Sequence, residues 1–496
     1  MPIKKVLLIQ PPLGRGMTKE LFQPIFPYGL AYVATSLLNS GYEVEIFDIY
    51  ANRWNRNQVL GKIKNIHCDV IGITAMSTQY SYVKWLAGEL KKQINTRIVL
   101  GGLLATYSSP IVLKNTQIDV CVVGEGETTI VELLDNIDDL KKVSGIAYRD
   151  NGRIIENQPR EYIEDLDTLP RPAYHLFPMD IYTKTKFYIH DPTTKIFKRR
   201  LTLKTMGVLT GRGCPYNCNF CSKSFKGLRL KSIDCIIDEI KYLQEKYGVE
   251  GIHFIDELFV VNKRRACELA KRLGSLNIKW DAQGRVNTID YDLLCEMKKA
   301  GCVAVGFGVE SGSNRILANM NKHITAEQSA QAMEDAGKAG LHIKVQLILG
   351  YPGESEETVA ETVNFFQKVK HPARRFSLIL PLPGSALYNE AVNKALIKDE
   401  EKYLTQIFDG YGSDRYPVFI NFTDLTTEQI YKLKRKAEME MERNYRRHLM
   451  KHPSLFIRHL YAELMNSIYT FIRRFVKFIN DPVFYAKKIW ARIYGF

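Results

Sequence analysis

The sequence predicts an α/β protein in which an N-terminal, five-stranded, doubly wound parallel sheet is followed by a partial barrel of six βα units and a helical C-terminal region. Two observations lead to this fold class. Short, nearly continuous apolar runs alternate with helical patterns such as 28-YGLAYVATSLLNSG-41, which is typical of parallel strands buried on both faces. The chain is also 496 residues long, more than one hydrophobic core usually holds, so several domains are expected.

Five apolar runs define the expected strands of the first domain, which we place at residues 1–140. They are KKVLLIQ (4–10), EVEIFDI (43–49), DVIGITA (69–75), RIVLGG (97–102) and VCVVGEG (120–126). In parallel sheets of this kind, ligands bind where loops leave the carboxyl ends of the strands. The loops at those ends are rich in glycine and small residues, which lets the backbone approach a large ligand. They are 10-QPPLGRG-16, 74-TAMS-77, 101-GGLLAT-106 and 124-GEGE-127.

A connecting segment, residues 141–200, is expected to hold a hairpin at 150-DNG-152 and a proline-punctuated stretch. The second βα series occupies residues 201–390, and Ser232 and Thr325 are the expected N-caps of two of its helices. Its expected strands are 207-GVLTGRG-213, 251-GIHFIDELF-259, 279-KWDAQGRV-286, 303-VAVGFGVES-311, 343-IKVQLILG-350 and 375-RFSLILP-381. Six units are too few for a closed eightfold barrel, so we expect a partial barrel that is open on one side.

Composition and charge exclude several classes of protein. Nine cysteines, scattered apart from one triplet, do not form a disulfide framework and indicate a reducing, cytoplasmic setting. The N-terminus lacks a signal-peptide pattern, and no window reaches the roughly 18 uninterrupted apolar residues of a membrane span. Most of the net charge of +15 lies from Arg443 to the end, where eleven Lys or Arg face two acidic residues. This distribution disfavours a protein that coats nucleic acid and favours a local basic surface.

The C-terminal region, residues 391–496, has a helical pattern to its end. Its last part carries one apolar stripe at helical spacing, flanked by Arg458, Arg473 and Lys477. The stripe consists of Ile457, Leu460, Tyr461, Leu464, Ile468, Phe471, Phe475 and Ile479. Such a pattern predicts either a helix that lies in a membrane interface or a helix docked on its own barrel.

The stretch 211-GRGCPYNCNFCSKSFKG-227 places Cys214, Cys218 and Cys221 within eight residues. Iron–sulfur clusters are held by cysteine thiolates, usually four for a 4Fe-4S cluster. Three ligands leave one iron without a protein side chain, so a small molecule can bind there. A structural zinc site would need a fourth ligand, and Cys235 lies fourteen residues further on, in an expected helix. We therefore predict one 4Fe-4S cluster at the triplet.

The triplet, with Phe220 before its last cysteine, resembles the signature of the radical S-adenosylmethionine (SAM) enzymes. The resemblance implies that the vacant iron binds the methionine part of SAM, and that an electron from the cluster cleaves the sulfonium to give a 5′-deoxyadenosyl radical. In this family the radical chemistry belongs to the cofactor, while the protein supplies position and excludes water.

Two later segments continue the resemblance. The segment 308-GVESGS-313 is similar to the one that places a carboxylate, here Glu310, and a hydroxyl, here Ser311, near the ribose and amino group of SAM. The segment 346-QLILGYPGE-354 is similar to the family's adenine-contacting strand, and it contributes Ile348 and Gly350. The resemblance thus implies a SAM site made of Phe220, Glu310, Ser311, Ile348 and Gly350.

The order of the domains resembles the cobalamin-binding branch of the same family. The resemblance implies that cobalamin contacts the loops of the first domain, at Pro12, Thr74, Ser77, Gly101, Gly102, Gly124, Glu125 and Gly126. Members with a cobalt-ligating histidine carry it in an Asp-x-His-x-x-Gly motif, which is absent, and His67 is the only histidine of this domain. Cobalamin is therefore expected to bind without a protein histidine ligand, and a degenerate domain that no longer binds it is the alternative.

The resemblance implies an enzyme that functionalises an unactivated carbon, with methyl transfer from cobalamin to a lipid-like or other apolar substrate as the leading hypothesis. The basic, amphipathic tail favours such a substrate and a peripheral membrane contact. An oxidative cyclase of a tetrapyrrole-like substrate is the alternative within the class, and a non-catalytic cobalamin or redox sensor is the alternative outside it. A flavodoxin or ferredoxin is the expected electron donor, and no nucleic-acid partner is expected.

Overall fold

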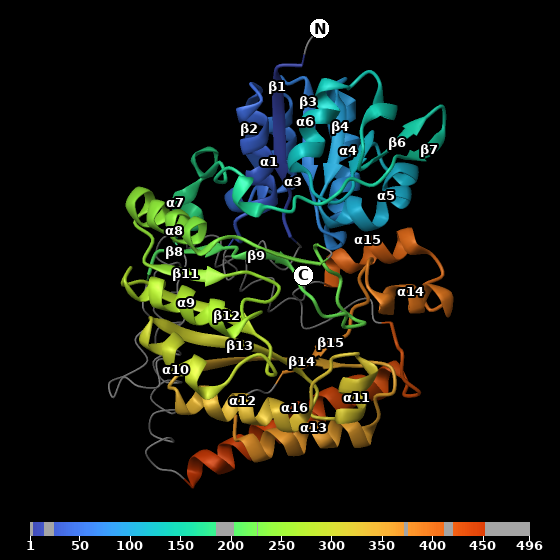
Figure 1. The fold of residues 1–496 in the computed structure, drawn as a ribbon. Helices are drawn as coiled ribbons and strands as arrows, with labels where there is room; N and C mark the ends of the chain where they lie inside the picture. Colours follow the sequence, from blue (N-terminus) through green and yellow to red (C-terminus); the bar gives the residue numbers. More distant parts are fainter. Residues whose placement is uncertain are drawn as a thin grey trace, which may run out of the picture.

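The computed structural model describes residues 3–13, 24–184, 203–225, 227–371, 375–410 and 420–451. These residues form two large sheets, one above the other in Figure 1 with helices around each, and a separate two-stranded ribbon. The apolar stripe predicted within residues 457–479 lies outside the described residues, so its membrane contact stays a prediction. Within the described ranges, no helix combines the length and the hydropathy that a membrane span requires.

The first sheet confirms the five predicted parallel strands and adds two antiparallel ones. The strands are β1 (Lys5–Gln10), β2 (Glu43–Asp48), β3 (Val70–Thr74), β4 (Arg97–Gly101), β5 (Val120–Val122), β6 (Ile146–Asp150) and β7 (Arg153–Glu156). They lie in the order β2-β1-β3-β4-β5-β6-β7, and β6 and β7 are the hairpin predicted at 150-DNG-152. Asn151 and Gly152 both have positive φ, 49° and 81°, as a two-residue hairpin turn of this kind requires.

Helices cover both faces of the first sheet, which explains why its strands are apolar almost without interruption. On one face, residues such as Val6, Leu8 and Val99 pack with α1 (Tyr28–Asn39) and α6 (Glu127–Asp135). On the other face, Leu7, Ile9 and Leu100 pack with the remaining helices of the domain. Those helices are α2 (Ile49–Asn52), α3 (Arg56–Ile63), α4 (Tyr80–Gln93) and α5 (Leu103–Asn115).

The second sheet is the predicted partial barrel, with six parallel strands. They are β8 (Thr205–Val208), β11 (Gly251–Phe254), β12 (Lys279–Gly284), β13 (Cys302–Glu310), β14 (His342–Leu349) and β15 (Ser377–Leu378), in the order β15-β14-β13-β12-β11-β8. The predicted strand 207–213 is divided: its first part belongs to β8, and its last part, β9 (Gly211–Gly213), pairs with β10 (Leu228–Leu230) in a separate ribbon. The ribbon brackets the cysteine triplet, so the triplet lies in a loop closed at its base.

Six helices wrap the outer face of the barrel (Figure 1). They are α8 (Ile233–Tyr247), α9 (Lys263–Gly274), α10 (Tyr291–Lys299), α11 (Asn314–Asn319), α12 (Ala326–Lys338) and α13 (Glu356–Val369). Both predicted caps are confirmed: the hydroxyl of Ser232 accepts from the Cys235 N–H, and that of Thr325 accepts from the Gln328 N–H. Such caps satisfy orphan N–H groups of the first helical turn and so fix where the helix begins.

The C-terminal helices tie the two sheets together. In Figure 1, α14 (Ala386–Asn393) and α15 (Glu400–Gly410) lie below the first sheet, and their apolar residues, among them Tyr403 and Leu404, join its core. Tyr80 of α4 donates to the Glu401 carboxylate at 2.9 Å. The long helix α16 (Thr427–Met450) instead packs on α13 of the barrel. The chain therefore returns to its first domain after completing the second.

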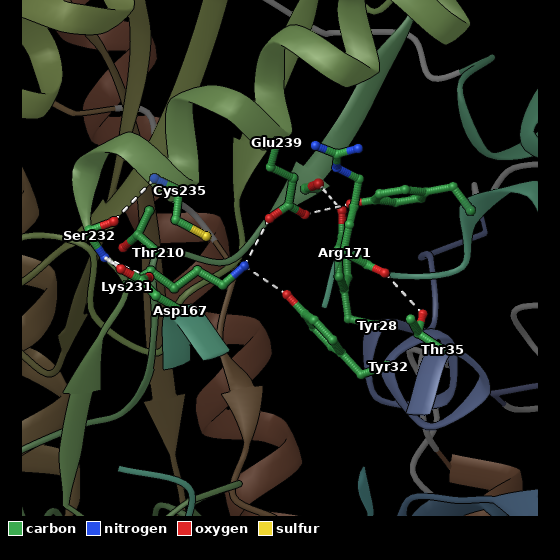
Figure 2. A network of polar contacts seen from close by, with 12 residues as sticks. Tyr28, Tyr32, Thr35, Asp167, Arg171, Thr210, Lys231, Ser232, Cys235 and Glu239 are labelled. Atoms are coloured by element: carbon green, nitrogen blue, oxygen red, sulfur yellow. Dashed lines mark hydrogen bonds and ion pairs between the residues drawn. The ribbon is translucent and has the colours of Figure 1, made fainter. Parts of the chain in front are cut away.

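The connecting segment joins α1 to the barrel through a buried polar network (Figure 2), close to the short helix α7 (Met179–Tyr182). The ammonium of Lys231 donates to the Tyr32 hydroxyl at 2.7 Å and to the Glu239 carboxylate at 2.8 Å. The hydroxyl of Tyr174 donates to the other oxygen of Glu239, and Thr35 donates to the carbonyl of Arg171 at 2.9 Å. The network thus holds α1, the connecting segment and the barrel in one arrangement.

A second buried network connects the 124-GEGE-127 loop to the ribbon at the barrel. Arg212 of β9 pairs with both Glu125 and Glu127, and Arg229 of β10 pairs with Glu125 at 2.9 Å. Burial opposes ionisation of Glu125, but its hydrogen bonds from Arg229, Ile163 N–H and Arg212 hold its pKa below the usual value. The Glu125 carboxylate is therefore charged in the folded protein and pairs with both arginines.

Replacing Arg212 with methionine should destabilise the protein by about 3–5 kcal/mol, because two carboxylates would remain buried beside one remaining arginine. The measurement is the free energy of unfolding from a urea titration. Lys338→Ala, which removes an exposed ion pair with Glu334, is the control and should leave the transition unchanged. Equal midpoints for the Arg212→Met variant and the wild type would show that this network does not hold the domains together.

Candidate active site

The cysteine loop, residues 214–225, is held by hydrogen bonds from several elements at once. The backbone N–H of Asn219 donates to the Met320 carbonyl at 3.0 Å, and the Asn219 carbonyl accepts from the Leu387 N–H at 2.9 Å. Tyr107 of the first domain donates to the carbonyl of Lys223 at 2.7 Å, and the N–H of Ser224 donates to Glu257 at 2.7 Å. Because both domains contribute, the shape of the loop depends on how the two sheets meet.

The three thiols of the triplet lie in one electrostatic environment. Burial raises the pKa of the Cys214 thiol and raises that of Cys221 to about 11, with the Glu257 carboxylate and the neighbouring thiols adding to the effect. Among the described residues, no three His, Cys, Asp or Glu side chains form a group that could hold a single metal ion. The triplet fits a cluster through the chemistry of its donors, since iron–sulfur clusters take cysteine thiolates.

The alternative fourth ligand, Cys235, lies elsewhere. It is in the first turn of α8, where its backbone N–H donates to the Ser232 hydroxyl and its thiol interacts with Asp167 (Figure 2). Those neighbours belong to the connecting segment and the helix start, not to the cysteine loop. The geometry gives the zinc alternative no support.

Glu310 and Phe220, two of the residues expected at the SAM site, are brought together through Lys322. The ammonium of Lys322 donates to the Glu310 carboxylate at 3.0 Å and lies 5.6 Å from the centroid of the Phe220 ring. Glu310 ends β13 with a positive φ of 62°, a conformation that is costly for a residue with a side chain. Such strain is typical of functional sites, and here it aims the carboxylate at Lys322 beside the cysteine loop.

Ile348 and Gly350 also lie near Phe220, whereas Ser311 is turned inward. Ile348 and Phe220 pack against the same small apolar cluster. The N–H of Gly350 donates to Glu354 at 3.0 Å, and burial raises the pKa of that carboxyl to about 7. The buried Ser311 hydroxyl is 3.2 Å from that of Thr362 and accepts from the Ser313 N–H. The direct contacts of these residues with SAM stay predictions.

A cavity that opens to solvent lies between the first sheet and the cysteine loop, and the empty space within it and at its mouth is about 970 Å³. The carboxyl ends of the parallel strands supply six of the predicted cobalamin contacts to its wall: Thr74, Gly101, Gly102, Gly124, Glu125 and Gly126. Pro12 and Ser77 are not among the residues that line it. The carbonyls of Pro11 and Pro12 accept from the side chain of the buried Gln79, so they support the rim instead.

The composition of the cavity suits a large, partly apolar ligand. Its depth is lined by aliphatic side chains of the sheet and α6, such as Leu8, Val99 and Ile130, and its barrel side by Leu209 and Phe225. None of the described residues that line it is a histidine. His67 lies three residues before β3, at the amino end of that strand and so at the opposite edge of the sheet. These residues fit cobalamin bound without a histidine ligand.

Sequence reasoning missed the barrel side of this cavity, which includes Arg212, Ser224 and Phe225. It also missed Lys322 as the partner of Glu310. A weak signal existed for Arg212, since a charged residue inside an apolar predicted strand needs a buried partner. Its two acidic partners stood in the 124-GEGE-127 loop. No local pattern pointed to Lys322 or Phe225.

Two family models match the chain, each over one of the two sheets. The model of the B12 binding domain matches residues 14–134, and that of the Radical SAM superfamily matches residues 208–366. An uncharacterised methyltransferase of Pyrococcus horikoshii is 34% identical over 452 residues, which cover 88% of this chain and 92% of that protein. The chain belongs to the cobalamin-binding branch of the radical SAM superfamily. Its cofactors are a 4Fe-4S cluster, SAM and cobalamin.

Other members and fold neighbours extend over both sheets. The anaerobic magnesium-protoporphyrin IX monomethyl ester cyclase of Rubrivivax gelatinosus is 30% identical over 83% of this chain and 74% of that protein. The radical SAM methyltransferase TsrM of Kitasatospora setae, solved with cobalamin and a 4Fe-4S cluster, has a TM-score of 0.64 at 17% identity. The match covers 90% of this chain and 82% of that one, so the two-sheet fold is shared.

Replacing any one of Cys214, Cys218 and Cys221 with alanine should abolish stable cluster uptake, because a cluster with two protein ligands is poorly held. The measurement is iron and sulfide content per chain after anaerobic reconstitution. Cys235→Ala is the matched control and should retain the wild-type content. Loss of metal in the Cys235 variant, or zinc in place of iron in the wild type, would contradict the assignment of the triplet.

Proposed function

We propose that the protein is a cobalamin-dependent radical SAM enzyme that transfers a methyl group to an unactivated carbon of a small molecule. One observation carries the proposal: a single loop holds the cluster cysteines and also walls the cobalamin cavity. Cys221 and Ser224 are three residues apart, so their Cα atoms are at most about 11 Å from each other. That proximity supports a single reaction centre shared by the two predicted cofactor sites.

When bound, the cluster and SAM would supply the 5′-deoxyadenosyl radical, and cobalamin would supply the methyl group. The chain's own residues fix positions around them. Cys214, Cys218 and Cys221 would hold the cluster, Lys322 orients Glu310 toward the SAM side, and the glycines at the ends of β4 and β5 leave room for the corrin. A flavodoxin or ferredoxin is the proposed electron donor.

The inner wall of the barrel favours a polar substrate. Alternate residues of the strands pack outward against the helices, so His253, Asp281, Gln283 and Gln346 are on the inner face, and both glutamines are exposed. His253 lies 3.0 Å from Asp281, which also pairs with Lys344. Burial opposes ionisation of Asp281, but the hydrogen bond and charge of His253 and the charge of Lys344 keep its pKa below the usual value.

This wall differs from what a lipid would require. The lipid-like substrate predicted from the sequence rested on the C-terminal stripe, which lies outside the described residues. The charged side chains of this wall pair with one another, but the amides of Gln283 and Gln346 are exposed, and covering them with a lipid would cost their hydrogen bonds to water. We therefore favour a substrate that is polar over most of its surface and carries the reacting carbon at the end facing the cysteine loop.

The reconstituted enzyme, with SAM, cobalamin and a reductant, should form 5′-deoxyadenosine and S-adenosylhomocysteine together when the aqueous phase of a cell extract is added. The chloroform phase should give much less, because a lipid offers no hydrogen-bond partners to the exposed Gln283 and Gln346 of the inner wall. Liquid chromatography with mass spectrometry measures both products. Formation of 5′-deoxyadenosine without S-adenosylhomocysteine would favour the cyclase alternative, and no cleavage of SAM at all would favour the sensor.

Gly101→Leu should weaken cobalamin binding by about 1–3 kcal/mol, the usual cost of overpacking. Gly101 lines the cavity and has no atom within 4 Å of where a Cβ would lie, so the variant can fold while its side chain occupies the ligand space. The measurement is cobalamin retained after gel filtration, from absorbance. Gly88→Leu is the control, because Gly88 of α4 has equal room but lies outside the cavity. Equal retention in both variants would place cobalamin elsewhere.

A further inference from the structure

Arg285 follows the last residue of β12 and lies beside the cysteine triplet. It is only 7% exposed. Its Nη1 donates to the Sγ of Cys218 at 3.6 Å, and its guanidinium stacks on the Tyr216 ring at 3.7 Å from the centroid. Tyr216 and Cys218 therefore hold the Arg285 side chain from the two ends of the segment 216–218. Its charge lies next to Cys218, a predicted cluster ligand.

The remaining donors of Arg285 have no hydrogen-bond partner within the described part of the chain: Nε and Nη2 are both buried and unsatisfied. A guanidinium is planar and rigid, so these N–H groups lie in the same small region as Nη1. Buried polar groups without a partner are rare in folded proteins, and an absent water, ion or ligand is one physical reason for them. The described atoms of the protein therefore include no acceptor for these two donors next to Cys218.

The other buried cations near this mouth all have carboxylate partners. Arg212 and Arg229 pair with Glu125, Lys231 pairs with Glu239, and Lys322 pairs with Glu310. Arg285 contacts a sulfur instead. A buried cation needs a compensating negative charge, and a thiolate-ligated cluster provides one.

We propose that Arg285 is a positioning residue of the cluster, which donates hydrogen bonds to the Cys218 thiolate and to the adjacent cluster sulfide and thereby raises the reduction potential. The inference rests on the proposed function, because it requires a cluster at the triplet. Adding an electron to the cluster makes it more negative, and a fixed neighbouring cation stabilises that reduced state. The side chain thus makes the electron easier to deliver before SAM is cleaved.

Arg285 donates to a sulfur, whereas the two lysines near the triplet donate to oxygen atoms. Lys223, another cation of the loop, donates through its ammonium to the carbonyl of Cys214 and to Asn217 rather than to a sulfur. The ammonium of Lys322 donates to the Glu310 carboxylate at 3.0 Å, so this cation too is engaged by an oxygen rather than a sulfur. Hydrogen bonds to the sulfurs are among the main determinants of cluster potential, so a donor at the sulfur itself is the one expected to change it.

The test compares Arg285→Gln and Arg285→Lys with the wild type, after anaerobic reconstitution of the full chain. Iron and sulfide content is measured first, then the midpoint potential by a redox titration followed by electron paramagnetic resonance. We expect wild-type iron content in both variants and potentials that fall in the order wild type, Lys, Gln, since lysine keeps the charge but loses the fork of donors. Arg265→Gln, which loses donors to the carbonyls of Thr210 and Lys231, is the matched control and should keep the wild-type potential.

Equal potentials for the wild type and the Gln variant would overturn the inference. If the Gln variant binds too little iron to titrate, the Lys variant decides: a potential below that of the wild type supports the inference, and an unchanged one overturns it. A wild-type protein without any cluster would instead contradict the proposed function itself. The two failures are therefore distinguishable, and neither readout depends on turnover.

Discussion

The fold and its site depend on the buried ion pairs between the 124-GEGE-127 loop and the ribbon β9–β10. Arg212 and Arg229 meet Glu125 where the first sheet ends and the barrel begins. Buried charges are costly unless geometry and hydrogen bonds are nearly complete, so such a network tolerates few arrangements of the two domains. One consequence is local: β9 and β10 bracket the cysteine loop, and the network fixes that loop against the cavity of the first domain.

The sequence predicted the strands well because each one carries its own signal. An apolar run between helical patterns is a local feature, and all eleven expected strands have a counterpart in the structure. The bounds were predicted less well: the expected strands 251–259 and 375–381 shorten to Gly251–Phe254 and Ser377–Leu378. The division of 207–213 into β8 and β9 has a physical cause, because the chain leaves the barrel to form the ribbon that supports the cysteine loop. Glycines at 211 and 213 signal such a turn but do not say where the chain goes.

The site was only partly predictable, for the same reason. The cysteine triplet is local in sequence, whereas its surroundings are assembled from positions far apart. Glu125 was expected to contact cobalamin through a glycine-rich loop, and it does line the cavity, but its carboxylate is engaged by Arg212 and Arg229 about a hundred residues away. The pairing of Glu310 with Lys322 and the contact of Arg285 with Cys218 likewise depend on how strand ends converge, which no single-residue pattern records.

The distribution of charge around the mouth shows how one protein can hold a negatively charged cluster and a neutral interior together. Each cation of the interdomain contact is matched by carboxylates of the chain, so the contact itself adds little net charge to the site. Arg285, the cation beside the triplet, donates to the Cys218 sulfur instead of a carboxylate, and Glu257 accepts from the Ser224 N–H of the same loop. The charge beside the predicted cluster site therefore comes from other residues. The interdomain contact positions those residues but does not neutralise them. The buried ion pairs fix the two domains relative to each other. The charge at the proposed reaction centre is then determined by a few side chains at the ends of the barrel strands.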